Sequence, residues 1–170
     1  MLREAIVQLE QNGKTIVGFL EGMTDEEAVW RPAGGKWCAL EIINHLLDEE
    51  NEDFRKRLDL TLRHPERPWP SIDPEGWVVT RGYESKDMAG SLTDFLQQRE
   101  GSVVWLRSLK DPDFSRAHDH PKLGTITAGS ILASWVAHDL LHIKQIAKLK
   151  YERMAAIAAP HDAGYAGPWE

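Results

Sequence analysis

The stretch Trp135-Val-Ala-His138-Asp-Leu-Leu-His142-Ile143 decides the fold and the candidate chemistry of this chain. The apolar positions around it run from Ile131 to Ile146 in steps of three or four, which is the spacing of a helix with one buried face. Both histidines fall on that face. Residues four apart on a helix have Cβ atoms about 6 Å apart, so both imidazoles can reach one metal ion. We therefore predict a helix from Thr125 or Thr127 to about Tyr151 that carries part of a metal site.

A third ligand is needed, because a catalytic metal site usually takes three protein ligands and leaves one position open. His45 is the candidate, since it lies beside the apolar stripe of a helix that the pattern predicts over residues 37–62. Facing helices of a bundle assemble metal sites in its core. A buried imidazole nitrogen without a partner costs about 1–3 kcal/mol, and a shared cation would remove that cost for each ring. The spacing alone leaves open that the histidines are hydrogen-bonded core residues.

Two further long helices follow from apolar residues at helical spacing, one over residues 2–21 and one from Ser85, a plausible N-cap, to about Leu109. Thr24–Glu27 has the spacing of a capping box and predicts a single short helical turn. Together with the two histidine-bearing helices, these segments predict an all-α fold, a four-helix bundle. We expect a single domain over residues 1–170.

The connections are expected to lack regular structure. Residues 64–84 are rich in proline and tryptophan, and a loop of this length could be a lid or a pocket wall, or could simply pack onto the bundle. Residues 111–125 form a second connection, and residues 158–170 are expected to be an irregular tail.

Composition narrows the class of protein. The chain has 170 residues, a formal net charge of -7 and one cysteine, Cys38. The acidic balance argues against nucleic acid as a partner, because phosphates would be repelled. One cysteine excludes an internal disulfide and fits a reducing cytoplasm, and no stretch is apolar enough for a membrane. We expect a cytoplasmic protein with no membrane contact, and a homodimer, the commonest assembly of soluble oligomers.

Two histidine-bearing segments resemble those of a known family. Trp37-Cys-Ala-Leu-Glu-Ile-Ile-Asn-His45-Leu-Leu-Asp48 and Trp135-Val-Ala-His138-Asp139-Leu-Leu-His142 are similar to the two histidine segments of the DinB-like superfamily, and in particular of its YfiT-like branch of metal-dependent hydrolases and thiol S-transferases. The resemblance implies a bundle in which His45, His138 and His142 bind one divalent ion, zinc or nickel. It leaves the reaction open between hydrolysis and transfer of a low-molecular-weight thiol. An HExxH metalloprotease is excluded, because position 139 is aspartate.

Four charged residues are candidates for supporting roles at such a site. Asp48 follows His45 by about one turn and Asp139 is next to His138, so each could orient a ligand or transfer a proton. Arg57 and Arg99 could hold the carboxylate of a small-molecule substrate or cofactor. Each of the four could instead form an ordinary ion pair. The competing class of function is a non-enzymatic bundle that binds metal structurally or works through protein contacts.

Overall fold

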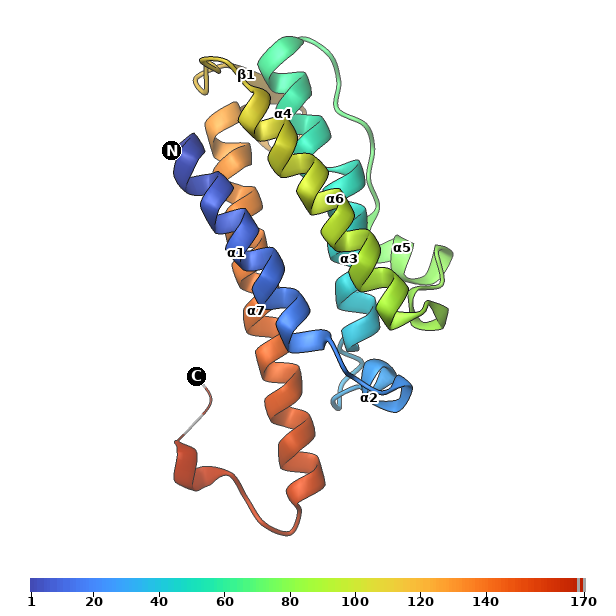
Figure 1. Ribbon diagram of the computed structural model, residues 1–170. Coiled ribbons are helices and arrows are strands. Elements are labelled where there is room, and N and C mark those ends of the chain that lie inside the picture. Colours follow the sequence, from blue (N-terminus) through green and yellow to red (C-terminus); the bar gives the residue numbers. More distant parts are fainter. Residues whose placement is uncertain (168, 170) are drawn as a thin grey trace.

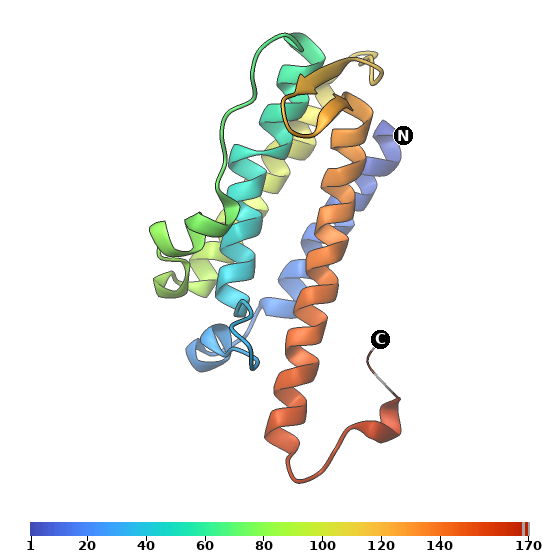
Figure 2. The same ribbon diagram turned by 180° about the vertical axis from the view of Figure 1, so that it is seen from behind.

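The computed structural model describes residues 1–167 and 169, and its four long helical segments form a bundle (Figure 1). These are α1 (Leu2–Leu20), α3 with α4 (Ala39–Glu52 and Phe54–Arg63), α6 (Met88–Ser108) and α7 (Ala128–Ala158). Seen from behind, α7 runs beside α3 and α4, while α1 and α6 lie on the other side (Figure 2). The predicted four-helix bundle is confirmed. No helix among the described residues has the length and apolarity needed to cross a bilayer.

The connections contain more regular structure than expected. The short helix predicted after Thr24 is present as α2 (Asp25–Val29). The two connections that were expected to be irregular contain α5 (Pro74–Thr80), a 3-10 turn η1 (Tyr83–Ser85) and the strands β1 (Ala117–His120) and β2 (Gly124–Thr127), and the tail contains a second 3-10 turn, η2 (Gly164–Ala166). The strands form an antiparallel hairpin in which Ala117 pairs with Thr127. Thr127 then caps α7 by accepting a hydrogen bond from the Ser130 amide. The prediction that both connections are irregular was therefore wrong.

The predicted helix over residues 37–62 is broken at Asp53, where φ is -114° and ψ is -91°. No glycine or proline marks this position, so the sequence did not predict the break. The Asp53 carboxylate lies 2.6 Å from Arg57 Nε, and the next residue, Phe54, stacks on Trp135 with ring centroids 5.9 Å apart.

Two helix ends also differ from the prediction. The N-cap of α6 is Asp87 rather than Ser85, because its carboxylate accepts the Gly90 amide at 2.5 Å. Helix α7 continues past Tyr151 to Ala158. The capping box at Thr24 is present as predicted, with Thr24 Oγ1 accepting the Glu27 amide and the Glu27 carboxylate accepting the Thr24 amide.

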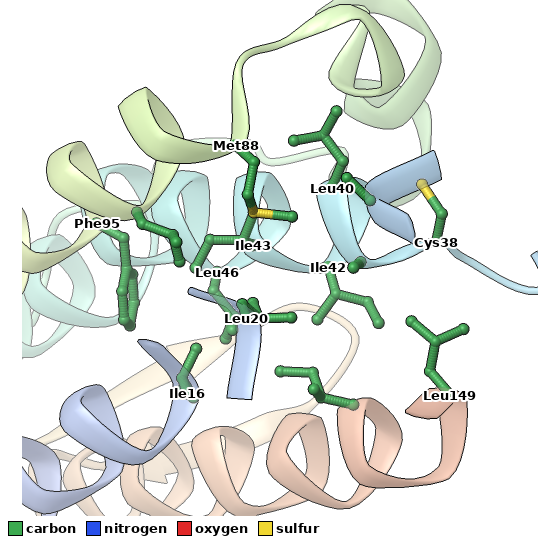
Figure 3. Packing of buried hydrophobic residues seen from close by; sticks show 14 residues of the cluster. Ile16, Leu20, Cys38, Leu40, Ile42, Ile43, Leu46, Met88, Phe95 and Leu149 are labelled. Atoms are coloured by element: carbon green, nitrogen blue, oxygen red, sulfur yellow. The ribbon is translucent and has the colours of Figure 1, made fainter. Parts of the chain in front are cut away.

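Hydrophobic side chains from all four helical segments form two buried clusters. The first contains, among others, Ile16, Leu20, Ile43, Phe95 and Leu149 (Figure 3). The second contains Leu9, Leu58, Leu106, Leu132 and Trp135. Along each of these helical segments, one buried polar residue lies between the residues of the first cluster and those of the second. These residues are Asn12 in α1, Glu50 in α3, Arg99 in α6 and Asp139 in α7. We call these four residues the central polar layer.

Candidate metal centre

Three histidines from two helices converge in the interior between α3 and α7. His45 comes from α3, and His138 and His142 come from successive turns of α7. The Nε2 atom of His138 lies 3.3 Å from Nε2 of His45 and 3.1 Å from Nε2 of His142. One ring nitrogen from each histidine lies within 4.8 Å of the other two. The structure thus brings together the three residues that the sequence analysis selected, and we call them the histidine triad.

Two of the three separations between these nitrogens, 3.3 and 3.1 Å, fit a shared cation. Two nitrogens bound to one tetrahedral zinc at about 2.0–2.1 Å are separated by about 3.3 Å. Hydrogen bonds within the triad cannot satisfy all three atoms, because Nε2 of a neutral imidazole is either a single donor or a single acceptor and His138 faces two neighbours. A divalent ion would satisfy the three lone pairs together.

One neighbour sets the proton position on a ligand. Nδ1 of His142 lies 2.7 Å from Oε1 of Gln145, and an amide oxygen can only accept, so Nδ1 of His142 carries the proton. The lone pair of His142 is therefore on Nε2, the atom that faces the triad. Nδ1 of His45 is buried without a hydrogen-bond partner among the described residues. A cation on Nε2 of His45 would leave the proton on that Nδ1.

Burial keeps the triad neutral. It lowers the pKa of His45 and of His138 to about 3, with the neighbouring His142 adding to the shift at both residues. Burial also lowers the pKa of His142, although its hydrogen bond with Gln145 opposes this. Aromatic rings enclose two of the imidazoles: Trp37 packs on His45 at 4.9 Å and Phe54 on His138 at 5.1 Å between ring centroids. A neutral imidazole is the form that binds metal.

Asp139 and Arg99 belong to the central polar layer. The Asp139 carboxylate accepts two hydrogen bonds from the Arg99 guanidinium, at 2.6 and 2.9 Å, and one from Asn12 at 3.3 Å. The same guanidinium donates to both carboxylate oxygens of Glu50, at 2.9 and 3.1 Å. Of the two alternatives for Arg99, the structure shows the ion pair and not the binding of a substrate carboxylate, because its side chain is 4% exposed and its donors are occupied. A proton-transfer role for Asp139 stays a prediction.

Asp48 points to a different part of the molecule. Its carboxylate accepts a short hydrogen bond from the Tyr83 hydroxyl and pairs with Arg81 at 2.7 Å, which ties α3 to the segment that contains α5 and η1. Asp48 does not hydrogen-bond to His45, so the predicted direct orientation of that ligand was wrong. A role for Asp48 in proton transfer stays a prediction.

Arg57 is held by two neighbours. Its Nε lies 2.6 Å from Asp53, and its guanidinium stacks over the Trp69 ring at 4.9 Å. Trp69 in turn donates to Thr61 of α4 at 3.2 Å, so the loop after α4 packs onto the bundle at this point. Cofactor or substrate binding by Arg57 stays a prediction.

Sequence reasoning missed one buried carboxyl pair. Glu49 and Asp53 are both buried, and burial together with the Asp53 charge raises the pKa of Glu49 to about 8. Glu49 follows His45 by four residues, so its position on the histidine face was visible in the sequence. Its burial was not, because that depends on how α6 and α7 pack against α3.

A groove of about 410 Å³ adjoins the triad. It lies between residues 32–37 and the part of α7 from His142 to Glu152, and His142 and Trp37 line it together with Gln145. This volume is in the range of small-molecule sites. We call it the triad groove.

These features define a class of protein: a helical bundle with a three-histidine cluster of the kind that holds a divalent metal ion. The model of the DinB superfamily matches residues 8–146, and the chain belongs to this superfamily.

Three comparisons describe the relatives. YfiT of Bacillus subtilis (strain 168), named "Putative metal-dependent hydrolase YfiT", is 32% identical over 145 residues, which cover 83% of this chain and 79% of YfiT. The uncharacterised protein YuaE of the same organism is 26% identical over 145 residues, covering 77% of this chain and 88% of YuaE. The solved structure of YfiT, described as a probable metal-dependent hydrolase with an unusual four-helix bundle topology, matches with a TM-score of 0.79 and 26% identity over 90% of this chain and 87% of that one. The resemblance to the YfiT-like branch is confirmed.

Proposed function

We propose that this chain is a metal-dependent enzyme that hydrolyses a small molecule, with a zinc or nickel ion held by His45, His138 and His142. The observation that carries the proposal is the convergence of three neutral imidazoles on one point through their Nε2 atoms. The similarity to YfiT supports it, because that relative is named as a metal-dependent hydrolase.

The number of ligands favours a reactive site over a structural one. Structural zinc sites have four protein ligands, whereas catalytic sites have three and an open position. Among the described residues the cluster contains three histidines and no fourth cysteine, histidine or carboxylate ligand. This favours the enzyme over a non-enzymatic bundle with a structural metal.

Each neighbouring residue would have a distinct task. A divalent ion on three neutral imidazoles keeps its full charge and, as a Lewis acid, lowers the pKa of a coordinated water or thiol. Gln145 holds the proton of His142 on Nδ1. Trp37 and Phe54 hold the rings of His45 and His138 and exclude water from them.

The central polar layer would act as a positioning device. Glu50 and Asp139 bind the same guanidinium, that of Arg99, and so set how far α3 and α7 slide along each other. Because these two helices carry the three histidines, the layer helps to place His45 opposite His138 and His142.

The first test is metal content. Elemental analysis of tag-free protein should find about one zinc or nickel per chain. The metal should be lost in His45→Ala and His142→Ala and retained in the control His161→Ala, which changes an exposed histidine near the end of the chain. Metal retained in His45→Ala at full occupancy, with the fold intact by circular dichroism, would show that α3 does not supply a ligand.

The second test separates the reactions. Metal-loaded protein is incubated with a panel of small esters and amides, with and without an added low-molecular-weight thiol. Turnover without thiol that is lost in His142→Ala supports hydrolysis. Turnover that requires the thiol and consumes it would replace hydrolysis with thiol S-transfer. Metal binding without turnover in either series would support the non-enzymatic alternative.

A further inference from the structure

The triad groove has one apolar wall and one polar wall. Trp37, Pro32 and Leu149 provide apolar surface. Trp37 faces two ways, because its ring also packs on His45 at 4.9 Å between centroids. A molecule lying on the Trp37 side of the groove would therefore be next to the triad.

The polar groups that the groove offers to a ligand are donors. The oxygen of Gln145 is occupied by His142 at 2.7 Å, so its amide NH2 group is what remains available. Lys148 also lines the groove, and no carboxylate lies within ion-pair distance of it among the described residues. A ligand that fits this wall must therefore present acceptor oxygens.

The single carboxylate of the groove is paired through one of its oxygens. Glu152 Oε1 lies 3.1 Å from Lys36 Nζ, and Glu152 Oε2 is buried without a hydrogen-bond partner among the described residues, so it is not exposed to a ligand in the groove. This ion pair neutralises Lys36 and leaves Lys148 as the uncompensated charge of the groove. In a chain with a net charge of -7, this local positive charge is opposite in sign to the molecule as a whole.

We propose that the triad groove binds a small carboxylate with an apolar body, its carboxylate on Lys148 and the Gln145 amide and its body on Trp37. Such a ligand would place its uncharged part against His142. The inference deepens the proposed function and rests on it, because it treats the groove as the substrate site of the triad.

The test compares two probes with the same phenyl ring and head groups of opposite charge. Binding of 4-phenylbutyrate and 4-phenylbutylamine is measured by calorimetry on wild type, Lys148→Gln and Lys144→Gln, each with and without bound zinc. Lys144 is exposed on α7 and does not line the groove, so it is the matched control. We expect the carboxylate to bind zinc-free wild type about tenfold more tightly than the amine does. Lys148→Gln should weaken binding of the carboxylate about fivefold.

The possible outcomes are distinct. Equal affinity for both probes, no binding of either, or equal effects of Lys148→Gln and Lys144→Gln would each overturn the inference. Carboxylate binding that requires zinc and ignores Lys148 would also overturn it, because the probe would then be on the metal. Zinc uptake measured on the same preparations keeps the two proposals apart: a protein that takes up zinc but binds neither probe refutes only the groove, and a protein that binds the carboxylate but takes up no zinc when zinc is offered refutes only the metal enzyme.

Discussion

Replacing Arg99 with methionine should strongly destabilise the protein, because it leaves two buried carboxylates without their cation. Arg99 donates five hydrogen bonds, two to Glu50, two to Asp139 and one to the Leu9 carbonyl. The Glu50 and Asp139 side chains are each 1% exposed, so water cannot replace the guanidinium. After the change, the remaining side-chain donors among the described residues are the Trp135 indole for Glu50 and the Asn12 amide for Asp139.

Removing one partner of a buried ion pair costs about 3–5 kcal/mol. Against a typical free energy of unfolding of about 5–15 kcal/mol, Arg99→Met should lose a large fraction of the stability. The assay is urea unfolding of metal-free protein at pH 7, followed by circular dichroism. The control is Arg107→Met on the same helix, whose partner Glu10 is 36% exposed; it should lose less than about 1 kcal/mol.

A second variant tests the cause. Arg99→Met combined with Glu50→Gln and Asp139→Asn leaves no charge in the central polar layer, so it should recover most of the lost stability. A loss below about 1 kcal/mol for Arg99→Met, or a triple variant less stable than the single one, would refute the reasoning that unpaired buried charge is the main cost.

Three further predictions concern the histidine face of α3 and α7. In the native state, the pKa of His45 and of His138 is about 3, so both stay neutral until the pH approaches that value. In the unfolded chain they take up protons near pH 6.5. The contribution of these histidines to the stability of metal-free protein is therefore complete above pH 6.5 and is lost as the pH falls. The expected loss is about 2.5 kcal/mol between pH 7 and 5.5 by denaturant unfolding, and an unchanged slope in His45→Gln would contradict this origin. The pKa of Glu49 is raised to about 8, so the native state keeps a proton that the unfolded state loses above pH 4.5, and stability falls as the pH rises between these values. Glu49→Gln should therefore increase the free energy of unfolding, more at pH 8 than at pH 5, and a gain independent of pH would argue against a buried neutral carboxyl. Gln145→Leu removes the hydrogen bond to Nδ1 of a ligand and should weaken zinc binding by about 10–100-fold in a competition assay with a chelator, whereas zinc affinity equal to wild type would show that Gln145 does not set the tautomer.

The histidine positions were predictable to an unusual degree. The i, i+4 spacing of His138 and His142 is a local property, and a helix places two such rings on one face whatever surrounds it. The position of His45 beside the apolar stripe of a second helix made it the candidate third member, and the family resemblance implied the same residue. The sequence did not show that Nε2 of His45 would lie 3.3 Å from His138, since the two residues are 93 positions apart and only packing brings them together.

The contacts of Asp139 and Glu49 could not be predicted from the local sequence. In the sequence, Asp139 is simply a carboxylate beside a ligand, and its bidentate bond to Arg99 depends on how α1 and α3 hold α6 and α7 on opposite sides of the bundle interior. Asp48 and Glu49 are adjacent and chemically alike, yet one pairs with Arg81 and the other is buried next to Asp53. The helix phase separates their directions by about 100°, and the neighbouring helices decide which direction is interior.

By itself the sequence determined the number and approximate extent of the long helices. It also placed His138 and His142 on one face of a helix, on successive turns, and it excluded an HExxH site. These depend on helical periodicity and on residue identity, which are local. Only the tertiary structure decided the break at Asp53, the hairpin before α7, the central polar layer and the triad groove. The central polar layer and the triad groove arise from contacts between segments far apart in the chain, whose distances no local pattern records. The hairpin is a local structure, but its strands are short and show no clear alternation of apolar and polar residues.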